Sequence, residues 1–262
     1  MNTTKKTMHW SVFGTGKINL VFLHGWGLHS VAWNTIIPIL KPHFTLHTFD
    51  LPGFGENIDF PIMTFKKISK YLSKQINTKV IWIGWSMSGL IVHHLSLQYP
   101  HNTLATIYVN SSPCFIQRKN WPGIPKRLLY SIKESMLPYY SNFLKKFFLL
   151  HVIDVHKYKL SRLKIKEKLF KKYPSPKKEA IEIGYKWLTK IDHRNTIIYS
   201  NVPTLRIYGE LDHLISKKAR EKTDNLYQKK NSILIKGAKH APFLSHPKTF
   251  CKIIYNFIKK TI

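Results

Sequence analysis

Cysteine, acidic side chains and long apolar runs are all scarce in this chain of 262 residues. Neither the number nor the placement of its two cysteines, Cys114 and Cys251, indicates a disulfide framework or a metal site, so we expect two reduced thiols. No apolar run approaches the roughly 20 residues that a membrane-spanning helix needs. Residues 1–10 are polar and basic and lack the apolar core of a secretory signal. The sequence therefore predicts a cytoplasmic protein with no membrane segment.

The shortage of acidic residues leaves a large positive charge. Thirteen Asp and Glu oppose 42 Lys and Arg, which gives a formal net charge of +29. Such a balance favours nucleic acid as a partner. The lysines are spread along the chain instead of forming one stripe, and no nucleic-acid-binding motif accompanies them, so we expect no such partner. A basic surface that attracts an acidic protein is the better interpretation, and a coding bias towards Ile, Lys, Asn and Tyr is the alternative.

Short apolar runs alternate with segments that can form helices. The expected strands cover residues 18–23, 44–49, 80–83, 104–109, 204–208 and 232–235. Several of them lack polar alternation, which is typical of strands in a parallel sheet covered on both faces. Helices are expected at residues 65–75, 90–98 and 248–259. This alternation predicts an α/β fold with a mostly parallel sheet flanked by helices.

The middle of the chain, residues 114–187, contains no convincing strand. Prolines divide it into short helical pieces; they are Pro122, Pro125, Pro138, Pro174 and Pro176. Phe143, Phe147 and Leu150 are spaced i, i+4, i+7, which predicts one apolar helix face. Because the strand pattern resumes near residue 204, we expect a helical cap, or lid, at 114–187. It would be inserted into one core made of residues 1–113 and 188–262.

The strongest chemical signal is the segment GWSMSG at residues 84–89. It follows an apolar run and precedes a helical one, so Ser86 is expected at a tight strand-to-helix turn with its hydroxyl above the sheet. In the usual pattern, G-x-S-x-G, the fifth residue is glycine. Here it is Ser88, which is small enough for the turn, and Gly89 follows. We interpret Ser86 as a nucleophile, and the alternative is an ordinary turn with an incidental serine.

A serine hydroxyl is a weak nucleophile unless a base lies beside it. His240 comes just after the last expected strand, at the carboxyl edge of the sheet, and His246 is its nearest rival. Asp212 follows the strand at 204–208 and is expected to orient His240 and stabilise its charged form. Glu210, closer to the strand end, is the alternative acid. The order Ser86, Asp212, His240 is the nucleophile, acid, histidine order of α/β-hydrolases.

The segment HGWG at residues 24–27 follows the first expected strand. Its glycines let the backbone fold so that amide groups point inward. The backbone N–H groups of Trp26 and Met87 are therefore the predicted oxyanion hole. A glycine turn with a packing tryptophan is the alternative. The segment DLPGFG at residues 50–55 follows the next strand; we expect it to shape the edge of the sheet and assign it no chemistry.

Several longer phrases make the chain resemble one family, the pimeloyl-[acyl-carrier protein] methyl ester esterases of biotin synthesis. They are LHGWG, DLPGFG, GWSMSGL, NSSPCF, WPGI, LRIYGELD and AKHAPFLSHP, from residue 21 to the C-terminal helix. The nucleophile and histidine motifs occur throughout the α/β-hydrolases, whereas WPGI, SSPCF and HAPFLSHP are much narrower. The resemblance implies an α/β-hydrolase core with a helical cap. It also implies a carboxylic ester hydrolase that uses no metal ion or organic cofactor.

The resemblance further implies where the acyl group would bind and which partner carries it. The substrate-binding residues would be Trp26, Ser86, Met87, Phe147, Phe148, Leu149, Leu150, His151 and His240. In the family the cap stretch ends in a polar amide, whereas here it ends in His151. The family docks its acidic acyl carrier protein on cap arginines, and this cap carries mostly lysines instead: Lys145, Lys146, Lys157, Lys159 and Lys164, with Arg162. We expect a monomer that binds acyl carrier protein.

Two other function classes stay open at this stage. A general short-chain carboxylesterase or a carbon–carbon bond hydrolase would share the same fold and the same three residues, and only the narrower phrases argue against them. A non-catalytic binding module is the alternative of another class. The presence of Ser86, Asp212 and His240 in the expected order speaks against a binding module.

Overall fold

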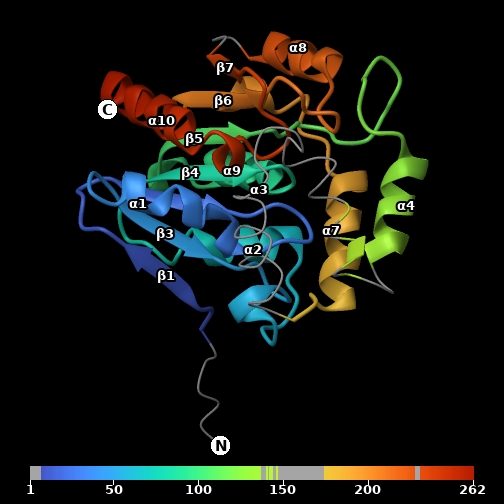
Figure 1. Cartoon of the computed structure of the whole chain (residues 1–262), viewed down its shortest axis with the longest axis horizontal. Helices are drawn as coiled ribbons and strands as arrows, with labels where there is room; N and C mark the ends of the chain where they lie inside the picture. Colours follow the sequence, from blue (N-terminus) through green and yellow to red (C-terminus); the bar gives the residue numbers. More distant parts are fainter. Residues whose placement is uncertain (1–6, 137–139, 141, 144–145, 147–173, 228–230) are drawn as a thin grey trace, which may run out of the picture.

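The computed structural model describes residues 7–136, 140, 142–143, 146, 174–227 and 231–262. Helices lie on both sides of a central sheet, as Figure 1 shows. The described strands are β1 (Trp10–Phe13), β2 (Asn19–Leu23), β3 (Thr45–Phe49), β4 (Val80–Trp85), β5 (Thr103–Val109), β6 (Thr204–Gly209) and β7 (Ser232–Ile235). Their order in the sheet is β1-β3-β2-β4-β5-β6-β7. β1 runs antiparallel to β3, and the other neighbours are parallel.

The α-helices lie between successive strands, except α9 and α10, which follow β7. They are α1 (Ile37–Leu40), α2 (Phe65–Leu72), α3 (Ser88–Gln98), α4 (Lys126–Met136), α7 (Lys178–Lys190), α8 (Lys217–Leu226), α9 (Pro242–Ser245) and α10 (Pro247–Thr261). Short 3-10 turns are η1 (Ser30–Thr35), η2 (Gly55–Asn57), η3 (Pro100–Asn102) and η4 (Ile197–Tyr199). None of the described helices has the length and apolarity that a membrane crossing requires.

Alternate strand residues face two different helical layers. Along β4, Ile81 and Ile83 pack with α1, α9 and α10, while Val80 and Trp82 pack with α2 and α3. All six residues of β4 are buried, as a central strand of a doubly covered sheet requires. Because β2, β4, β5 and β6 run parallel, their carboxyl ends lie at one edge of the sheet, where the loops can meet.

The six strands expected from the sequence are all present, and five of them differ by one or two residues at their ends. The α/β prediction is therefore correct. The sequence did not indicate β1 or α8. β1 is a four-residue edge strand with only half-buried and exposed positions, so it carries little apolar signal. α8 is rich in charged residues, with no apolar stripe to reveal it.

Between β5 and β6, the described residues of 114–187 include α4, α7 and further helical residues at 140, 142–143 and 146, and no strand longer than an isolated bridge. α4 and α7 lie side by side at one end of the sheet (Figure 1), and Lys133 Nζ of α4 is 3.2 Å from Glu182 Oε1 of α7. α7 packs closely on loops at the carboxyl edge, since a Cβ added to Gly184 would lie 2.4 Å from the Trp26 ring. Helical structure therefore covers the edge where the predicted catalytic residues lie.

Three histidines form a cluster between α3 and the segment that follows α7. The ring centroids of His93 and His193 are 4.6 Å apart, and His94 stacks at 6.5 Å from His193. Burial, together with the neighbouring histidines, lowers the pKa of His93 to about 3 and that of His193 to about 4. His93 Nε2 is 2.9 Å from Thr196 Oγ1. The neutral cluster thus joins α3 to the chain that re-enters the sheet.

We predict that acid weakens the fold through His93. Its folded pKa is lowered, so below the unfolded value of 6.5 the unfolded chain binds the proton that the folded chain refuses. The contribution of His93 to the free energy of unfolding is therefore fully present above pH 6.5. It falls by up to about 1.4 kcal/mol per pH unit as the pH drops towards the pKa of the folded state. Urea unfolding at pH 7, 6 and 5 measures the free energy of unfolding. Between pH 7 and pH 5 this free energy should fall less for His93→Gln than for the wild-type protein. Equal losses would contradict the prediction.

Candidate active site

Ser86 occupies the sharp turn between β4 and α3, with a left-handed φ of 53°. A non-glycine residue in this region costs about 1–3 kcal/mol, so the surroundings must hold it. Its N–H donates to Val109 O at 2.9 Å, and its carbonyl accepts from Ser111 Oγ at 2.7 Å and from Gly89 N–H at 3.0 Å. A Cβ on Gly84 would lie 2.7 Å from Ser88 O. The turn predicted from GWSMSG is therefore present, with the Ser86 backbone tied to β5.

His240 and Asp212 form a buried hydrogen-bonded pair. His240 Nδ1 is 2.8 Å from Asp212 Oδ2, and the two side chains are 3% and 0% exposed. The other carboxylate oxygen, Oδ1, accepts from the N–H of Leu214 at 2.8 Å and of Ile215 at 3.3 Å. The carboxylate therefore favours the imidazole tautomer that carries its proton on Nδ1. In that tautomer Nε2 keeps a lone pair, which a general base needs.

Glu210 and His246, the alternatives to Asp212 as the acid and to His240 as the base, have other hydrogen-bond partners. Glu210 is exposed, and its Oε2 accepts from the Gly237 N–H at 2.8 Å. His246 Nδ1 lies 2.8 Å from Ser245 Oγ. The geometry thus pairs Asp212, and not Glu210, with His240.

Trp85 and Asn110 hold the histidine loop in place. Trp85 Nε1 donates to His240 O at 2.8 Å. Asn110, buried at the end of β5 with φ 42°, donates from Nδ2 to Lys239 O at 3.0 Å and accepts from Gly209 N–H on Oδ1 at 2.8 Å. Its amide therefore links β5, β6 and the loop before His240. Our sequence analysis missed Asn110, although a polar residue directly after a buried strand is a usable signal.

The predicted oxyanion donors lie on two adjoining segments. Met87 directly precedes α3, and Trp26 belongs to the loop after β2. Within the described residues, neither backbone N–H donates to another protein group. The Trp26 side chain donates from Nε1 to Ile181 O of α7 at 3.1 Å, and Tyr140 Oη donates to Gly27 O. The loop that carries Trp26 is thus fastened to the region between β5 and β6.

His24 fixes this loop from inside. Burial lowers its pKa to about 4, against an opposing influence from Asp50, so the imidazole is neutral near pH 7. Its Nε2 accepts from Leu51 N–H at 2.9 Å, which leaves the proton on Nδ1 to be donated to Gly25 O at 2.8 Å. Asp50 is buried and accepts from Ser30 N–H at 2.5 Å and Glu56 N–H at 2.8 Å. The DLPGFG segment therefore supports the loop, a role that the sequence did not reveal.

Ser86 and His240 open into an apolar pocket of about 520 Å³ that is partly open to solvent. Its other lining residues are Gly25, Trp26, Leu28, Trp85, Phe115, Ile124, Leu129, Ile132, Met136, Leu188 and Leu214. Of the substrate-binding residues that the family resemblance implied, Trp26, Ser86 and His240 line this pocket and Met87 does not. The others, Phe147, Phe148, Leu149, Leu150 and His151, lie outside the described residues. Our sequence analysis missed the apolar faces of α4 and α7, because their side chains are recognisable as lining only once both helices are placed over Ser86.

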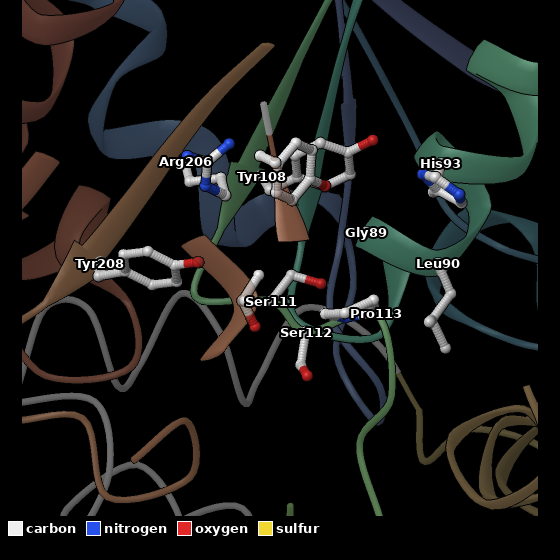
Figure 2. A pocket seen from close by; sticks show the side chains of 11 residues that line it. Gly89, Leu90, His93, Tyr108, Ser111, Ser112, Pro113, Arg206 and Tyr208 are labelled. Atoms are coloured by element: carbon white, nitrogen blue, oxygen red, sulfur yellow. The ribbon is translucent and has the colours of Figure 1, made fainter. Parts of the chain in front are cut away.

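A second cavity, of about 280 Å³, shares none of the first pocket's lining residues. Figure 2 shows Arg206 and Tyr208 of β6 on one side of it, with Leu90 and His93 of α3 on the other. Ser111 also lines it while donating to the carbonyl of Ser86. The turn at Ser86 therefore lies between this cavity and the apolar pocket, and of the two only the apolar pocket contains both Ser86 and His240. Among the described side chains, no three His, Cys, Asp or Glu are grouped so as to hold a metal ion.

We predict that the Asp212–His240 pair controls turnover. Asp212→Asn should lower kcat for p-nitrophenyl acetate by about 10³–10⁴-fold, because the amide no longer favours the productive tautomer. Glu210→Gln is the matched control, an acid-to-amide change two residues away, and should leave kcat unchanged. Circular dichroism melting would establish that both variants fold. The reverse pattern, with Glu210→Gln impaired and Asp212→Asn active, would assign the acid to Glu210.

Comparison with known sequences agrees with this geometry. The alpha/beta hydrolase fold family matches residues 18–247. The pimeloyl-[acyl-carrier protein] methyl ester esterase of Wigglesworthia glossinidia brevipalpis is 43% identical over 97% of this chain and 99% of that protein. The protein of the same name from Hamiltonella defensa is 38% identical, over 94% of this chain and 95% of its own.

Solved structures resemble the fold as a whole. A bromoperoxidase from Bacillus anthracis superposes with a TM-score of 0.85 at 21% identity, over 95% of this chain and 94% of the other. A thermophilic esterase from Thermogutta terrifontis gives 0.80 at 17% identity, over 97% and 93%. At such identities the likeness concerns the fold alone. On the family match and the nearly full-length sequence relatives, the chain belongs to the α/β-hydrolases and, within them, to the pimeloyl-[acyl-carrier protein] methyl ester esterases, a group of carboxylic ester hydrolases.

Proposed function

We propose that this protein hydrolyses the methyl ester of a pimeloyl group carried on acyl carrier protein, and so supplies free pimeloyl-[acyl-carrier protein] for biotin synthesis. The observation that carries the proposal is the apolar pocket that ends at Ser86 and His240. A pimeloyl chain is a run of methylene groups, and burying each one contributes about 0.8 kcal/mol. The family relationship supplies the identity of the chain and its carrier.

In this proposal Ser86 Oγ attacks the ester carbonyl while His240 Nε2 takes the hydroxyl proton. The carbonyl oxygen becomes an oxyanion, which the backbone N–H groups of Trp26 and Met87 stabilise. The C–O bond to the methoxy group then breaks, and His240 returns its proton so that methanol leaves. Asp212 stabilises the imidazolium that exists between the two proton transfers.

The acyl-enzyme is cleared by water through the same groups. His240 takes a proton from water as the oxygen attacks the acyl carbonyl, and the second oxyanion occupies the same two N–H groups. Breaking the bond to Ser86 Oγ returns the proton to the serine and releases the pimeloyl group with a free carboxyl. The net reaction is ester plus water to acid plus methanol, and each step balances with no other reactant.

We further propose that residues 114–187 form a cap on a core of residues 1–113 and 188–262, and that the cap docks the carrier. Exposed Lys126 and Arg127 on α4 contribute positive charge at this end of the molecule. Of the docking residues expected from the sequence, Lys146 is described and exposed, whereas Lys145, Lys159 and Arg162 lie outside the described residues. We propose a cytoplasmic monomer, with Cys114 and Cys251 as free buried thiols.

The first test of this function is turnover. Purified protein should release methanol from the methyl ester of pimeloyl-[acyl-carrier protein], and Ser86→Ala should abolish both this release and labelling by a fluorophosphonate probe. The gene should also restore growth to a biotin auxotroph that lacks the methyl ester esterase. Hydrolysis of p-nitrophenyl acetate without either result would favour a general short-chain esterase, and no hydrolysis of any ester would favour a binding module.

A second prediction concerns carrier docking. Pairs at a wet interface contribute only about 0.2–1 kcal/mol each, so the summed field should act mainly on the association rate. Added salt should therefore lower kcat/KM for the carrier-linked ester and leave that for p-nitrophenyl acetate unchanged. Replacing Lys145, Lys146, Lys159 and Arg162 together with Glu should impair only the carrier-linked reaction.

The matched control carries the same charge change on a different face. Lys248, Lys252, Lys259 and Lys260 are exposed on α10, which Figure 1 places on the opposite side of the molecule from α4 and α7. Replacing these four with Glu should have a much smaller effect than the cap variant. Equal losses in the two variants would show that net charge, and not the cap, attracts the carrier.

A further inference from the structure

Ser88 stands where the usual nucleophile pattern has glycine, and its hydroxyl has a specific partner. The residue is the first of α3 and is completely buried. Its Oγ donates a hydrogen bond to His24 O, at the end of β2 and 64 residues away in sequence. A glycine in this position would leave that carbonyl without the bond. Ser88 therefore joins the nucleophile turn to the loop that carries Trp26.

The bond acts on the peptide units that precede the Trp26 N–H. The carbonyl of Gly25 belongs to the same planar peptide as that N–H, and in a trans peptide the two groups point in opposite directions. His24 Nδ1 holds Gly25 O at 2.8 Å, and Leu28 N–H holds it at 3.3 Å. Ser88 holds the carbonyl one peptide earlier, at His24 itself. Two consecutive carbonyls are thus fixed, and with them the direction of the Trp26 N–H.

The other oxyanion donor lies directly beside Ser88. Met87 is its neighbour in sequence. The segment that contains the Met87 N–H is therefore also hydrogen-bonded, through Ser88, to the loop that contains the Trp26 N–H. We propose that Ser88 is a positioning residue whose hydroxyl sets the separation and direction of the two oxyanion donors. The proposal rests on the proposed ester hydrolysis, since both donors act only on an oxyanion.

Local helix stability does not account for the hydroxyl. Serine often caps a helix by accepting from a backbone N–H in the first turn. α3 has no side-chain capping hydrogen bond, and the Ser88 hydroxyl instead donates to β2. Its effect is therefore expected on the loop after β2.

The experiment compares Ser88→Ala with Ser96→Ala. Ser96 is also a buried serine of α3 whose Oγ donates to a backbone carbonyl, that of His93, so the chemical change is matched. Removing a whole oxyanion donor costs about 10²–10³ in rate, and displacing one should cost less. We expect kcat for p-nitrophenyl acetate to fall about tenfold in Ser88→Ala with KM nearly unchanged. Ser96→Ala should keep the wild-type kcat.

Inhibition by a trifluoromethyl ketone is a second measurement, and it should not change if Ser88 has only a structural role. The ketone adds to the serine as a tetrahedral oxyanion, so its inhibition constant should weaken in Ser88→Ala by the same factor as kcat/KM. Ser88→Thr, which retains the hydroxyl, should recover most of both losses. Ser88→Gly introduces the residue of the usual pattern, which the turn accommodates. Its kcat and its inhibition constant for the ketone should match those of Ser88→Ala.

Wild-type kcat and ketone binding in both Ser88→Ala and Ser88→Gly would overturn the proposal, as would equal losses in Ser96→Ala. These measurements use a small ester. Failure of the wild-type protein on the carrier-linked ester alone would therefore reject the proposed substrate and leave the inference about Ser88 to be decided by its own data.

Discussion

The left-handed turn at Ser86 is the constraint around which the site is built. It requires β4 and α3 to approach so closely that a Cβ on Gly84 would lie 2.7 Å from the helix backbone, and one on Gly89 would lie 2.0 Å from Ser111 Oγ. Such a conformation persists only when the neighbouring structure over-determines it. The carbonyl of Ser86 is accordingly held by Ser111 and its N–H by the end of β5. The backbone that carries the Ser86 hydroxyl is therefore held in a single conformation by its neighbours.

Much of this site follows from sequence because its parts are local. A serine between a strand and a helix, an acid after the next-to-last strand and a histidine after the last strand are each identifiable from a few neighbouring residues. The roles of Asn110 and His24 could not be predicted from the sequence, because they are hydrogen bonds between loops that are distant in sequence. The role of Asp50 could not be predicted for the same reason: its partners are backbone amides, which every residue except proline carries. The pocket lining escaped because it depends on where α4 and α7 sit.

The shortage of acidic residues has a structural counterpart. Several of the acids that remain are committed to internal contacts. Asp212 orients His240, Asp50 binds two loop amides, and Asp224 accepts from Arg206 Nε at 2.6 Å and from Ser232 Oγ. Asp192 pairs with Arg194 at 2.8 Å; partial burial acts to raise the pKa of that carboxyl, but the hydrogen bonds and charge of the arginine outweigh it and hold the pKa below its usual range. These four carboxylates therefore serve the internal structure, and little of their charge is left to offset the lysines and arginines.

The hydrogen bond from the Trp26 indole to Ile181 O couples the position of α7 to the loop that carries Trp26. One residue supplies both the amide proposed to stabilise the oxyanion and the side chain that grips α7. If α7 moved away to admit a long acyl arm, that bond would break and the amide would lose part of its support. The rigidity of the loop that carries Trp26 therefore depends on how closely α7 packs against it.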